Sequence, residues 1–576
     1  MSDTASLDAL IVGAGPTGLT LAGVLLRRGL RIRVVDSALA STSFSKAIGI
    51  QTRSMETFDL LGLAETFVAE GLPISHASFA SAGREIGQVS FDSLNTRFPF
   101  ILTLPQSDTE RILAGWVARL GGRIERGVTL ETFTQPAAPN VPSVSAAPIV
   151  ATLRHLDGAS ERVDAAWLIG CDGAHSRVRH LVGATFRGSA YPETFALADV
   201  RLAWALPPDR ARIFFHPEGL LAAFPLPGDR YRLIMDTGRG PRALAGASAD
   251  VAEDVAEGAA EGATSHPPAP TLDDVAVILR RRAGDSGAQL SDPRWLASFR
   301  VHARSVNHTR FGHVLLVGDA AHIHSPAGGQ GMNTGIQDAL NLGWKLALVQ
   351  RGLAHNALLD SYERERHPIA QAVIRETGAL LRAATLRNPL LRRARDGAFT
   401  LATAQPIVER RLVRQIAEVT INYRHSPLTQ PVRAPMTRGP RPGDFAPDVD
   451  GLRAPDGEPI RLYALLRGGA TALLSFTPEA RQSREQMREL AAAIQLWGDA
   501  LAAYRVAPGL AVSSAADASE PLPTLADPRD ALRRAFGIGD DASALVVIRP
   551  DGYLGLRAEG AASVEALRAY TARALG

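Results

Sequence analysis

The sequence predicts a multidomain α/β protein: a Rossmann-type nucleotide-binding domain, an inserted β-rich domain and a further α/β domain at the C-terminus. Three observations support this prediction. A glycine-rich turn joins a strand to a helix near the N-terminus, the middle of the chain has short apolar segments separated by Pro and Gly, and a Pro-rich linker precedes a final alternation of strands and helices. The length of 576 residues also exceeds what one core accommodates.

The composition is that of a globular protein without a nucleic-acid partner. Hydrophobic residues make up 46% and charged residues 21%. The 62 basic and 59 acidic residues leave a net charge of +3, and only Lys46 and Lys345 are lysines. Because the arginines are scattered along the chain, we expect no basic face for nucleic acid.

The single cysteine, Cys171, excludes an intramolecular disulfide and a CxxC redox centre. A reducing, cytoplasmic location is therefore expected. The most apolar stretch, residues 9–26, contains Gly and Pro and lacks a basic flank, so it is not read as a signal peptide. No stretch reaches the ~20 apolar residues of a spanning helix, and we expect no membrane partner.

The N-terminal turn has the features of a dinucleotide site. Gly13, Gly15 and Gly18 form GxGxxG directly after the apolar strand "ALIV", and a helix is expected from about Pro16 to Arg28. Gly15 lets the backbone approach a pyrophosphate, and the helix N-terminus stabilises its charge. Asp36, 18 residues beyond Gly18, ends the second strand, where a carboxylate accepts hydrogen bonds from a ribose. This pattern alone does not distinguish FAD from NAD.

Two later segments repeat the arrangement of an acidic residue after an apolar strand. "AAWLIGCDGAHSRVRHLVG" places Asp172 at a strand end, and "HVLLVGDAAH" places Gly318 and Asp319 at another. There is no second GxGxxG before a helix, so a separate domain for a nicotinamide nucleotide is not expected.

Together with GxGxxG, these segments resemble the three signatures of the flavoprotein aromatic hydroxylases, the family of p-hydroxybenzoate hydroxylase and phenol hydroxylase. "LPQSDTERIL" and "HSPAGGQGMNTGIQDALNLGWKLAL" are similar to the pentachlorophenol monooxygenase and polyketide hydroxylase branch. The resemblance covers about residues 7 to 395. It implies that FAD is the cofactor and that it is bound by Gly13, Gly15, Pro16, Thr17, Gly18, Asp36, Lys46, Arg53, Gln106, Asp172, Gly318, Asp319, Pro326, Gly329, Gly331, Met332 and Asn333.

The resemblance also implies individual roles. Asp319 is expected to bind a ribityl hydroxyl, residues 325–329 to lie against the isoalloxazine ring, and residues 331–333 to open a helix at its pyrimidine edge, where N–H groups stabilise negative charge. Lys46 stands where most members have arginine and lacks the planar fork of arginine. Alternatives remain: Asp319 as a turn cap, Arg53 as a solvated helix charge, and Asp172 as a tie between strand and helix.

The implied activity is that of a single-component monooxygenase. It takes electrons from NADPH or NADH as a transient reductant, activates O2 as a flavin C4a-hydroperoxide and hydroxylates a phenolic or polycyclic aromatic substrate. No catalytic residue is singled out. His322 and His324 have no cluster of metal-ligating partners, so no metal is expected. The alternatives are a Baeyer–Villiger or antibiotic-inactivating oxygenase, and a flavoprotein that sequesters an aromatic ligand without turnover.

The expected domains follow from the changes in pattern along the chain. Phe214, Phe215, His216 and Phe224 are candidate substrate contacts, although core packing is the plainer interpretation. Residues 435–576 resemble the thioredoxin-like tail of phenol hydroxylase without CxxC, with a role in folding or dimer contacts, so a monomer or homodimer is expected. The expected limits are 1–180 for the first part of the FAD-binding domain (with 76–100 contributing to the substrate domain), 181–299 for the β-rich substrate domain, 300–400 for the second FAD-binding part, 401–434 for the linker and 435–576 for the tail.

Overall fold

The N-terminal strand lies in the middle of a mostly parallel sheet, whose strand order is β17-β18-β11-β1-β2-β8. The computed structural model describes residues 6–42, 45–135, 149–204, 207, 209–238, 268–284, 287–325, 328–430, 438–476, 484–509, 522–560 and 562–576. β1 pairs in parallel with β11 and β2, and β11 pairs in parallel with β18. The strands are β1 (Leu7–Val12), β2 (Ile32–Asp36), β8 (Ile124–Arg126), β9 (Thr129–Thr134), β10 (Ile149–Arg154), β11 (Ser160–Gly170), β17 (Arg310–Phe311) and β18 (Val314–Leu316).

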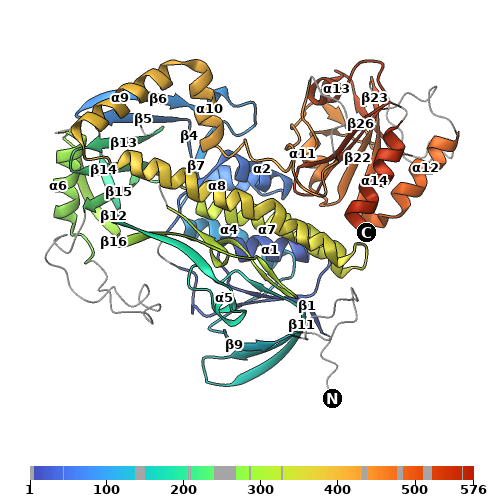
Figure 1. The fold of residues 1–576 in the computed structure, drawn as a ribbon, viewed down its shortest axis with the longest axis horizontal. Helices are drawn as coiled ribbons and strands as arrows, with labels where there is room; N and C mark the ends of the chain where they lie inside the picture. Colours follow the sequence, from blue (N-terminus) through green and yellow to red (C-terminus); the bar gives the residue numbers. More distant parts are fainter. Residues whose placement is uncertain are drawn as a thin grey trace.

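Long helices pack on this sheet, which buries their apolar faces away from water. α1 contacts both α4 and α7, and α8 runs beside α7 (Figure 1). A small sheet, β3-β7-β4, lies between this part and the middle domain. The elements are α1 (Pro16–Leu26), α2 (Thr52–Leu60), α3 (Ala64–Glu70), α4 (Gln106–Arg119), α5 (Arg177–Leu181), α7 (Gly331–Gln350), α8 (Asp360–Ala384), β3 (Gly49–Ile50), β4 (Leu72–Ile74) and β7 (Ile101–Thr103).

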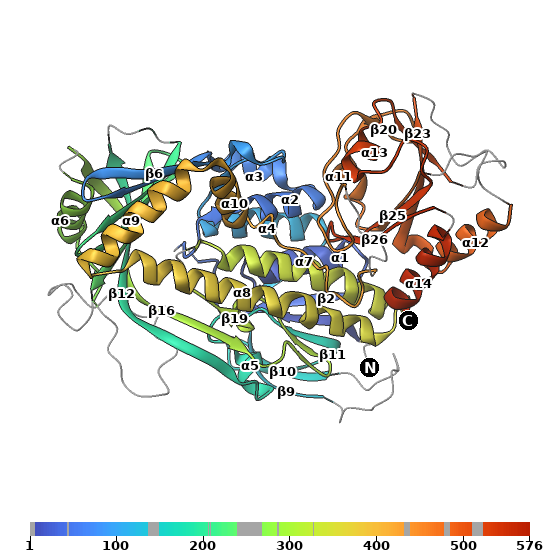
Figure 2. The same cartoon turned by 45° about the horizontal axis from the view of Figure 1, so that its top comes forward.

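The middle domain is an eight-stranded sheet of order β19-β16-β12-β15-β14-β13-β5-β6. Residues 76–90 join it through β5 and β6. α6 covers one face, and α9 packs on β6 (Figure 2). The elements are β5 (His76–Ser81), β6 (Arg84–Ser90), β12 (Phe186–Ala203), β13 (Arg210–His216), β14 (Gly219–Leu226), β15 (Arg230–Gly238), β16 (Gln289–Val306), β19 (His322–Ile323), α6 (Leu272–Ala283), α9 (Pro389–Ala404) and α10 (Pro406–Ile416).

The C-terminal part forms a seven-stranded sheet of order β21-β20-β24-β23-β22-β25-β26. The turn at Pro550–Gly552 joins two antiparallel strands, β25 and β26. Three strands, β20, β21 and β24, were not predicted, and the thioredoxin-like interpretation stays a prediction. The elements are β20 (Leu452–Arg453), β21 (Pro459–Ile460), β22 (Thr471–Ser475), β23 (Leu501–Pro508), β24 (Thr524–Asp527), β25 (Ala544–Ile548), β26 (Leu554–Glu559), α11 (Leu462–Leu466), α12 (Arg484–Gln495), α13 (Ala531–Phe536) and α14 (Ser563–Leu575).

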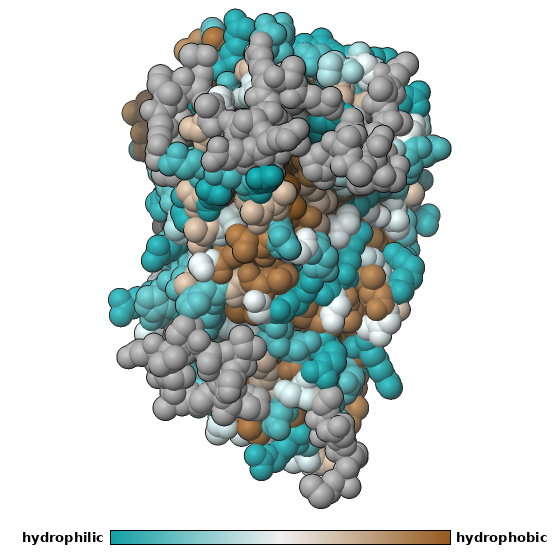
Figure 3. Space-filling model, turned by 90° about the vertical axis from the view of Figure 1, so that its right-hand side faces the viewer, coloured by the Kyte–Doolittle hydropathy of each residue, from teal (hydrophilic) through white to brown (hydrophobic). Residues whose placement is uncertain are grey.

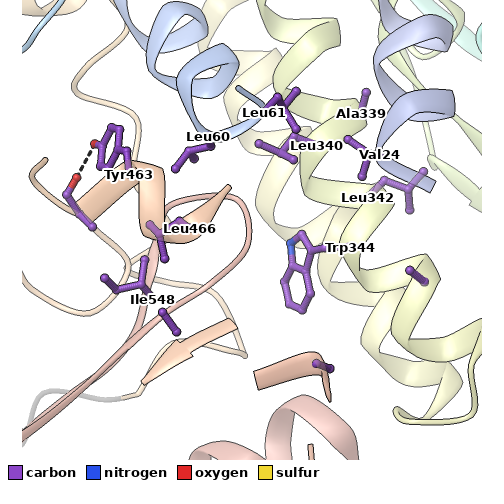
Figure 4. Close-up of a cluster of buried hydrophobic side chains, with 14 of the residues drawn as sticks. Val24, Leu60, Leu61, Ala339, Leu340, Leu342, Trp344, Tyr463, Leu466 and Ile548 are labelled. Atoms are coloured by element: carbon purple, nitrogen blue, oxygen red, sulfur yellow. Dashed lines mark hydrogen bonds between the residues drawn. The ribbon is translucent and has the colours of Figure 1, made fainter. Parts of the chain in front are cut away.

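The C-terminal part shares one hydrophobic core with the N-terminal domain. Figure 4 shows Trp344 and Leu340 of α7 opposite Leu466 of α11 and Ile548 of β25. Burial of side chains from both parts in one core couples their stabilities. The two parts therefore form one folded body, with the middle domain at the opposite end (Figures 1 and 2).

No helix in the described ranges is long and apolar enough to cross a membrane. No group of three or more His, Cys, Asp or Glu side chains in those ranges is arranged to hold a metal ion. The Ala- and Gly-rich insert at residues 239–267 lies outside the described residues.

Candidate cofactor and substrate site

Three turns meet at one edge of the parallel sheet. The Gly13–Gly18 turn follows β1, Asp172 follows β11, and the Gly318–Asp319 turn follows β18. These three strands are neighbours and parallel, so their carboxyl ends lie at the same edge. The tertiary structure thus brings together three segments that are far apart in the sequence.

The glycines of the first turn have two different functions. A Cβ on Gly13 would lie 2.3 Å from the carbonyl oxygen of Cys171, and one on Gly18 would lie 2.0 Å from that of Gly13. Gly13 also has φ = 104°, which disfavours other residues. A Cβ on Gly15 would meet nothing within 4 Å. Gly13 and Gly18 are therefore needed for the turn itself, whereas Gly15 borders open space where a pyrophosphate fits.

Thr17 and Pro16 complete this turn. Pro16 is the first residue of α1, and no side chain caps the helix N-terminus, which keeps its N–H groups available to an anion. Cβ atoms on Gly318 and Gly335 would lie 2.7 and 2.2 Å from Thr17 Oγ1. Thr17 thus packs α1 against the Gly318 turn and α7.

Asp36 is held at the end of β2. Its carboxylate accepts hydrogen bonds from the N–H groups of Ala14 (2.6 Å) and Ala38 (2.8 Å), and Arg126 lies 3.2 Å from Oδ2. The side chain is partly exposed at the glycine turn. This position suits hydrogen bonds from an adenosine ribose. Arg126 was not predicted, because its contribution depends on the pairing of β8 with β2.

Gln106 and Lys46 lie beside this part of the site. Gln106 accepts a hydrogen bond from the Ala47 N–H (3.1 Å) and donates one to Glu110 (2.9 Å). Burial raises the pKa of Glu110, partly offset by Gln106 and Arg126. Lys46 is exposed, and its charge acts on both Glu110 and Asp319. A cation between two carboxyl groups is placed to neutralise part of a phosphate or flavin charge.

Asp319 lines a recess. Its side chain is exposed to solvent, yet desolvation by the surrounding protein raises its pKa, against the opposing charges of His322 and Lys46. A carboxyl group that is both open and surrounded by protein lies in a concave site. The expected contact with a ribityl hydroxyl and the alternative of a turn cap both stay predictions.

The loop before α7 is held by side-chain amides. Asn333 donates hydrogen bonds to the carbonyls of Gly49 and Gly329 (both 2.9 Å) and accepts one from the Gln51 N–H (2.9 Å). Gly329 has φ = 62°, and Gly331 and Met332, both partly exposed, begin α7. Asn333 therefore shapes the loop, while the backbone N–H groups of the first turn remain available to a ligand. Pro326 lies outside the described residues.

A buried ion cluster beneath this loop was not predicted. Asp338 of α7 pairs with His322 (2.7 Å) and Arg366 (2.5 Å), and it accepts a hydrogen bond from the Gly318 N–H (3.3 Å). Burial alone favours protonation, but Arg366 and His322 hold the pKa of Asp338 below its ordinary value. The Gly318–Asp319 turn is thus bonded to Asp338 of α7 and, through Asp338, to α8. The sequence offered only the number of residues between Asp338 and the loop. That number does not predict a contact unless the packing of the helices is already known.

Arg53 and Asp172 make contacts different from those implied for a cofactor ligand. Arg53 is 4% exposed, pairs with Glu56 (2.5 Å) and lies 3.7 Å from the Phe445 ring. It is a buried link to the C-terminal part and not a solvated helix charge. Asp172 accepts hydrogen bonds from Ser176 Oγ (2.5 Å) and the Val178 N–H (3.1 Å), which fasten β11 to α5.

One face of the middle sheet packs on α6, and side chains of the other face pack against α8 and α10. Phe214 packs with the cluster that includes Leu279 of α6. Phe215 is 7% exposed and packs with Ala384 of α8, and Phe224 is partly exposed. His216 lies at the strand end, and burial lowers its pKa. Phe214 and Phe215 therefore pack in core clusters, and Phe224 also packs against one while part of its surface stays exposed.

A cavity of about 310 Å³ adjoins the loop on its α8 side. Gln330, which precedes α7, and Glu418 both line it. Glu418 is 2% exposed and accepts a hydrogen bond from Gln337 (2.6 Å). Burial raises its pKa to about 7, so this carboxyl group changes charge near neutral pH.

Comparison with known proteins agrees with this geometry. A family model described as FAD binding domain matches residues 6–377. The 6-methylpretetramide 4-monooxygenase of Streptomyces rimosus is 36% identical over 564 residues, which are 96% of this chain and 91% of the relative. The structure of OxyS anhydrotetracycline hydroxylase from Streptomyces rimosus superposes with a TM-score of 0.72 at 30% identity over 98% of both chains. That of aklavinone-11 hydroxylase, a ternary complex with FAD and aklavinone, superposes with a TM-score of 0.72 at 25% identity over 100% of both chains.

Proposed function

Because the chain belongs to the FAD-binding family of flavoprotein aromatic monooxygenases, we propose that it hydroxylates a polycyclic phenol of the polyketide type. The resemblance noted in the sequence is thereby confirmed, and so is FAD as the cofactor. The polycyclic substrate is the part proposed here. It is supported by the inner face of the middle sheet, together with the activities named for the relatives.

The observation that carries the proposal is the pattern of side chains on that face. Ile213, Phe224 and Ile234 are partly exposed, although each also packs against a core cluster. The three share a face, because antiparallel partners point to the same side and strand residues alternate. On the same face, Arg232 donates a hydrogen bond to the Lys46 carbonyl (3.1 Å). An apolar wall that is connected through Arg232 to the backbone at Lys46 suits a large aromatic ring system.

Each chemical requirement is assigned to residues of the chain. When bound, FAD takes electrons from NADPH or NADH and activates O2. The Gly15 turn would hold the pyrophosphate and Asp36 the ribose. Asp319 would accept a hydrogen bond from a ribityl hydroxyl, and the N-terminus of α7 would stabilise negative charge at the flavin edge. The apolar wall would exclude water from the reacting ring.

The test is oxidation of NADPH and NADH by the FAD-loaded protein across simple phenols and polycyclic aromatic polyketides, with the product mass recorded. We expect the polycyclic compounds to stimulate oxidation most and to gain one oxygen atom at an aromatic carbon. Oxygen inserted beside a carbonyl would instead indicate a Baeyer–Villiger reaction. Tight ligand binding without stimulation would assign the protein to sequestration and contradict the proposal.

A further inference from the structure

Large aliphatic side chains are exposed mainly on one short part of the chain. Ten such side chains in the described residues are exposed, and six of them lie within residues 380–408. Ile407 is 83% exposed and Leu390 is 72% exposed. The full set of six is Leu380, Leu390, Leu391, Leu401, Ile407 and Val408. Single exposed leucines are ordinary, but a group on adjacent helices indicates an interaction surface.

The orientation of α9 is set by its inner face. The Phe399 ring lies 4.6 Å from that of Phe79, Asp396 accepts a hydrogen bond from Ser81 Oγ (2.7 Å), and Arg395 lies 4.3 Å from the Phe215 ring. Residues 390, 394, 397, 401 and 404 are all exposed and recur at helical spacing on the other side. The apolar stripe therefore faces outward because the opposite face is already packed.

The same segment concentrates positive charge. Residues 380–414 contain eight arginines and two acidic residues, a net charge of +6, whereas the whole chain has +3. The two acids are bonded within the fold: Asp396 binds Ser81, and Glu409 accepts a hydrogen bond from the Ser90 N–H. The exposed arginines are Arg382, Arg387, Arg393, Arg410, Arg411 and Arg414. The partner of this surface must therefore be anionic.

A second copy of the chain does not meet this requirement. A two-fold dimer through these helices would place the +6 segment against itself. Hydrophobic side chains also gather at the centre of the side of the molecule on which the C-terminal part lies (Figure 3). In the described part of residues 438–576, however, Leu496 is the one large aliphatic side chain that is exposed. The charge and the aliphatic groups coincide on α9 and α10.

We propose that the outer faces of α9 and α10, here called the α9–α10 surface, dock onto an anionic phospholipid bilayer. The aliphatic side chains enter the boundary between headgroups and acyl chains, and the guanidinium groups bind lipid phosphates. α9 has 16 residues and is about 24 Å long, so it lies in the plane of the interface. No spanning helix is needed for this kind of association.

The position of the surface supports a flat partner. Figure 1 shows α9 and α10 beside β5 and β6 at one edge of the molecule, and both helices contact β6. A bilayer can dock on the α9–α10 surface without a groove there, whereas a partner helix would need a groove to bind. β6 and β5 belong to the sheet proposed to contact the substrate. Docking there would place the substrate domain at a surface where polycyclic aromatic molecules dissolve.

The test is flotation of the FAD-loaded full chain with two vesicle types, phosphatidylcholine alone and phosphatidylcholine with phosphatidylglycerol. We expect binding to the anionic vesicles only, and weaker binding as salt is raised. The triple variant Leu390→Ser, Leu401→Ser, Ile407→Ser should bind at least about ten-fold more weakly. The variant Arg393→Gln, Arg410→Gln, Arg411→Gln should lose the preference for anionic vesicles.

The matched control is Leu39→Ser with Leu156→Ser, which removes two equally exposed leucines elsewhere (69% and 73%). It should bind vesicles like the unaltered protein. Circular dichroism and FAD content check that all variants are folded. Absence of flotation with anionic vesicles, or binding unchanged in the Leu390 variant, would overturn the proposal. So would a dimer in solution that the same substitutions dissociate, because it would assign the surface to a second copy.

Discussion

The guanidinium group of Arg549, in the C-terminal hairpin, donates hydrogen bonds of 2.6 and 2.8 Å to both carboxylate oxygens of Glu365 on α8. Both side chains are fully buried. Lys345 of α7 also binds Glu365 (2.7 Å), and Asp551 binds Arg549 (2.6 Å). Burial alone would raise the pKa of Glu365, but Arg549 and Lys345 hold it well below its ordinary value. The C-terminal part thus completes an ion network inside the cofactor-binding domain.

Arg549→Met should therefore be strongly destabilising. It leaves the Asp551 carboxylate without its main cation and Glu365 with Lys345 as its remaining cation among the described residues, and breaking a buried pair costs about 3–5 kcal/mol. The free energy of unfolding in urea measures the effect. Arg351→Met is the control, because its partner Asp499 is exposed, and it should cost less than about 1 kcal/mol. Equal losses for the two variants would contradict this account.

Removal of residues 435–576 should yield insoluble protein. The deletion exposes Trp344 and Leu340, which pack against the C-terminal part, and leaves Lys345 and Glu365 without Arg549 and Asp551. Solubility after expression, compared with the full chain, is the measurement. A soluble truncated protein that binds FAD with unchanged affinity would show that the two parts are energetically independent.

Gly15→Val should abolish FAD binding, whereas Gly18→Ala should lower the stability of the apoprotein. A Cβ at Gly15 meets no protein atom within 4 Å, so the apoprotein should keep its melting temperature while FAD binding is lost. A Cβ at Gly18 collides with the Gly13 carbonyl, so the apoprotein itself should be destabilised. Thermal unfolding of the apoprotein and FAD titration separate the two effects. Tight FAD binding by Gly15→Val would contradict the assignment of this turn to the pyrophosphate.

Asp319→Ala should weaken FAD binding without unfolding the protein. The side chain is exposed in its recess, so its removal leaves no buried group unpaired. Loss of a hydrogen bond to a charged group corresponds to a roughly ten- to hundred-fold weaker affinity. Quenching of flavin fluorescence on titration gives the dissociation constant. Asp172→Ala is the contrast, because loss of the bonds to Ser176 and Val178 should lower stability first.

Glu418→Gln should stabilise the protein in a pH-dependent manner. Burial raises the pKa of Glu418 from 4.5 to about 7, so between these pH values the unfolded chain releases a proton that the folded chain retains. The wild-type protein thus loses up to about 3 kcal/mol as pH rises through this window. The variant lacks this loss. Its gain in melting temperature should be larger at about pH 8 than at about pH 5, and an equal gain at both would contradict the prediction.

Local patterns were sufficient for part of the site. The glycines of the first turn and Asp36 were predicted from spacing, because steric limits on a tight turn act between near neighbours in the chain. The Gly318–Asp319 turn was predicted from the resemblance to the flavoprotein aromatic hydroxylases. The helix expected from Pro16 to Arg28 was found at Pro16–Leu26. Arg53 shows the limit of this reasoning: its charge suggested a cofactor contact or a solvated position, and it is buried against Phe445.

The sequence by itself determined the order of the elements, the nucleotide-binding turns and the class of chemistry, because each depends on residues close together in the chain. Only the tertiary structure decided which charges are buried as partners, such as Arg549 with Glu365 across 184 positions. It also decided which face of α9 meets solvent, since a helical period does not say which side is packed. Both depend on contacts between segments whose separation in sequence carries no information about distance in space.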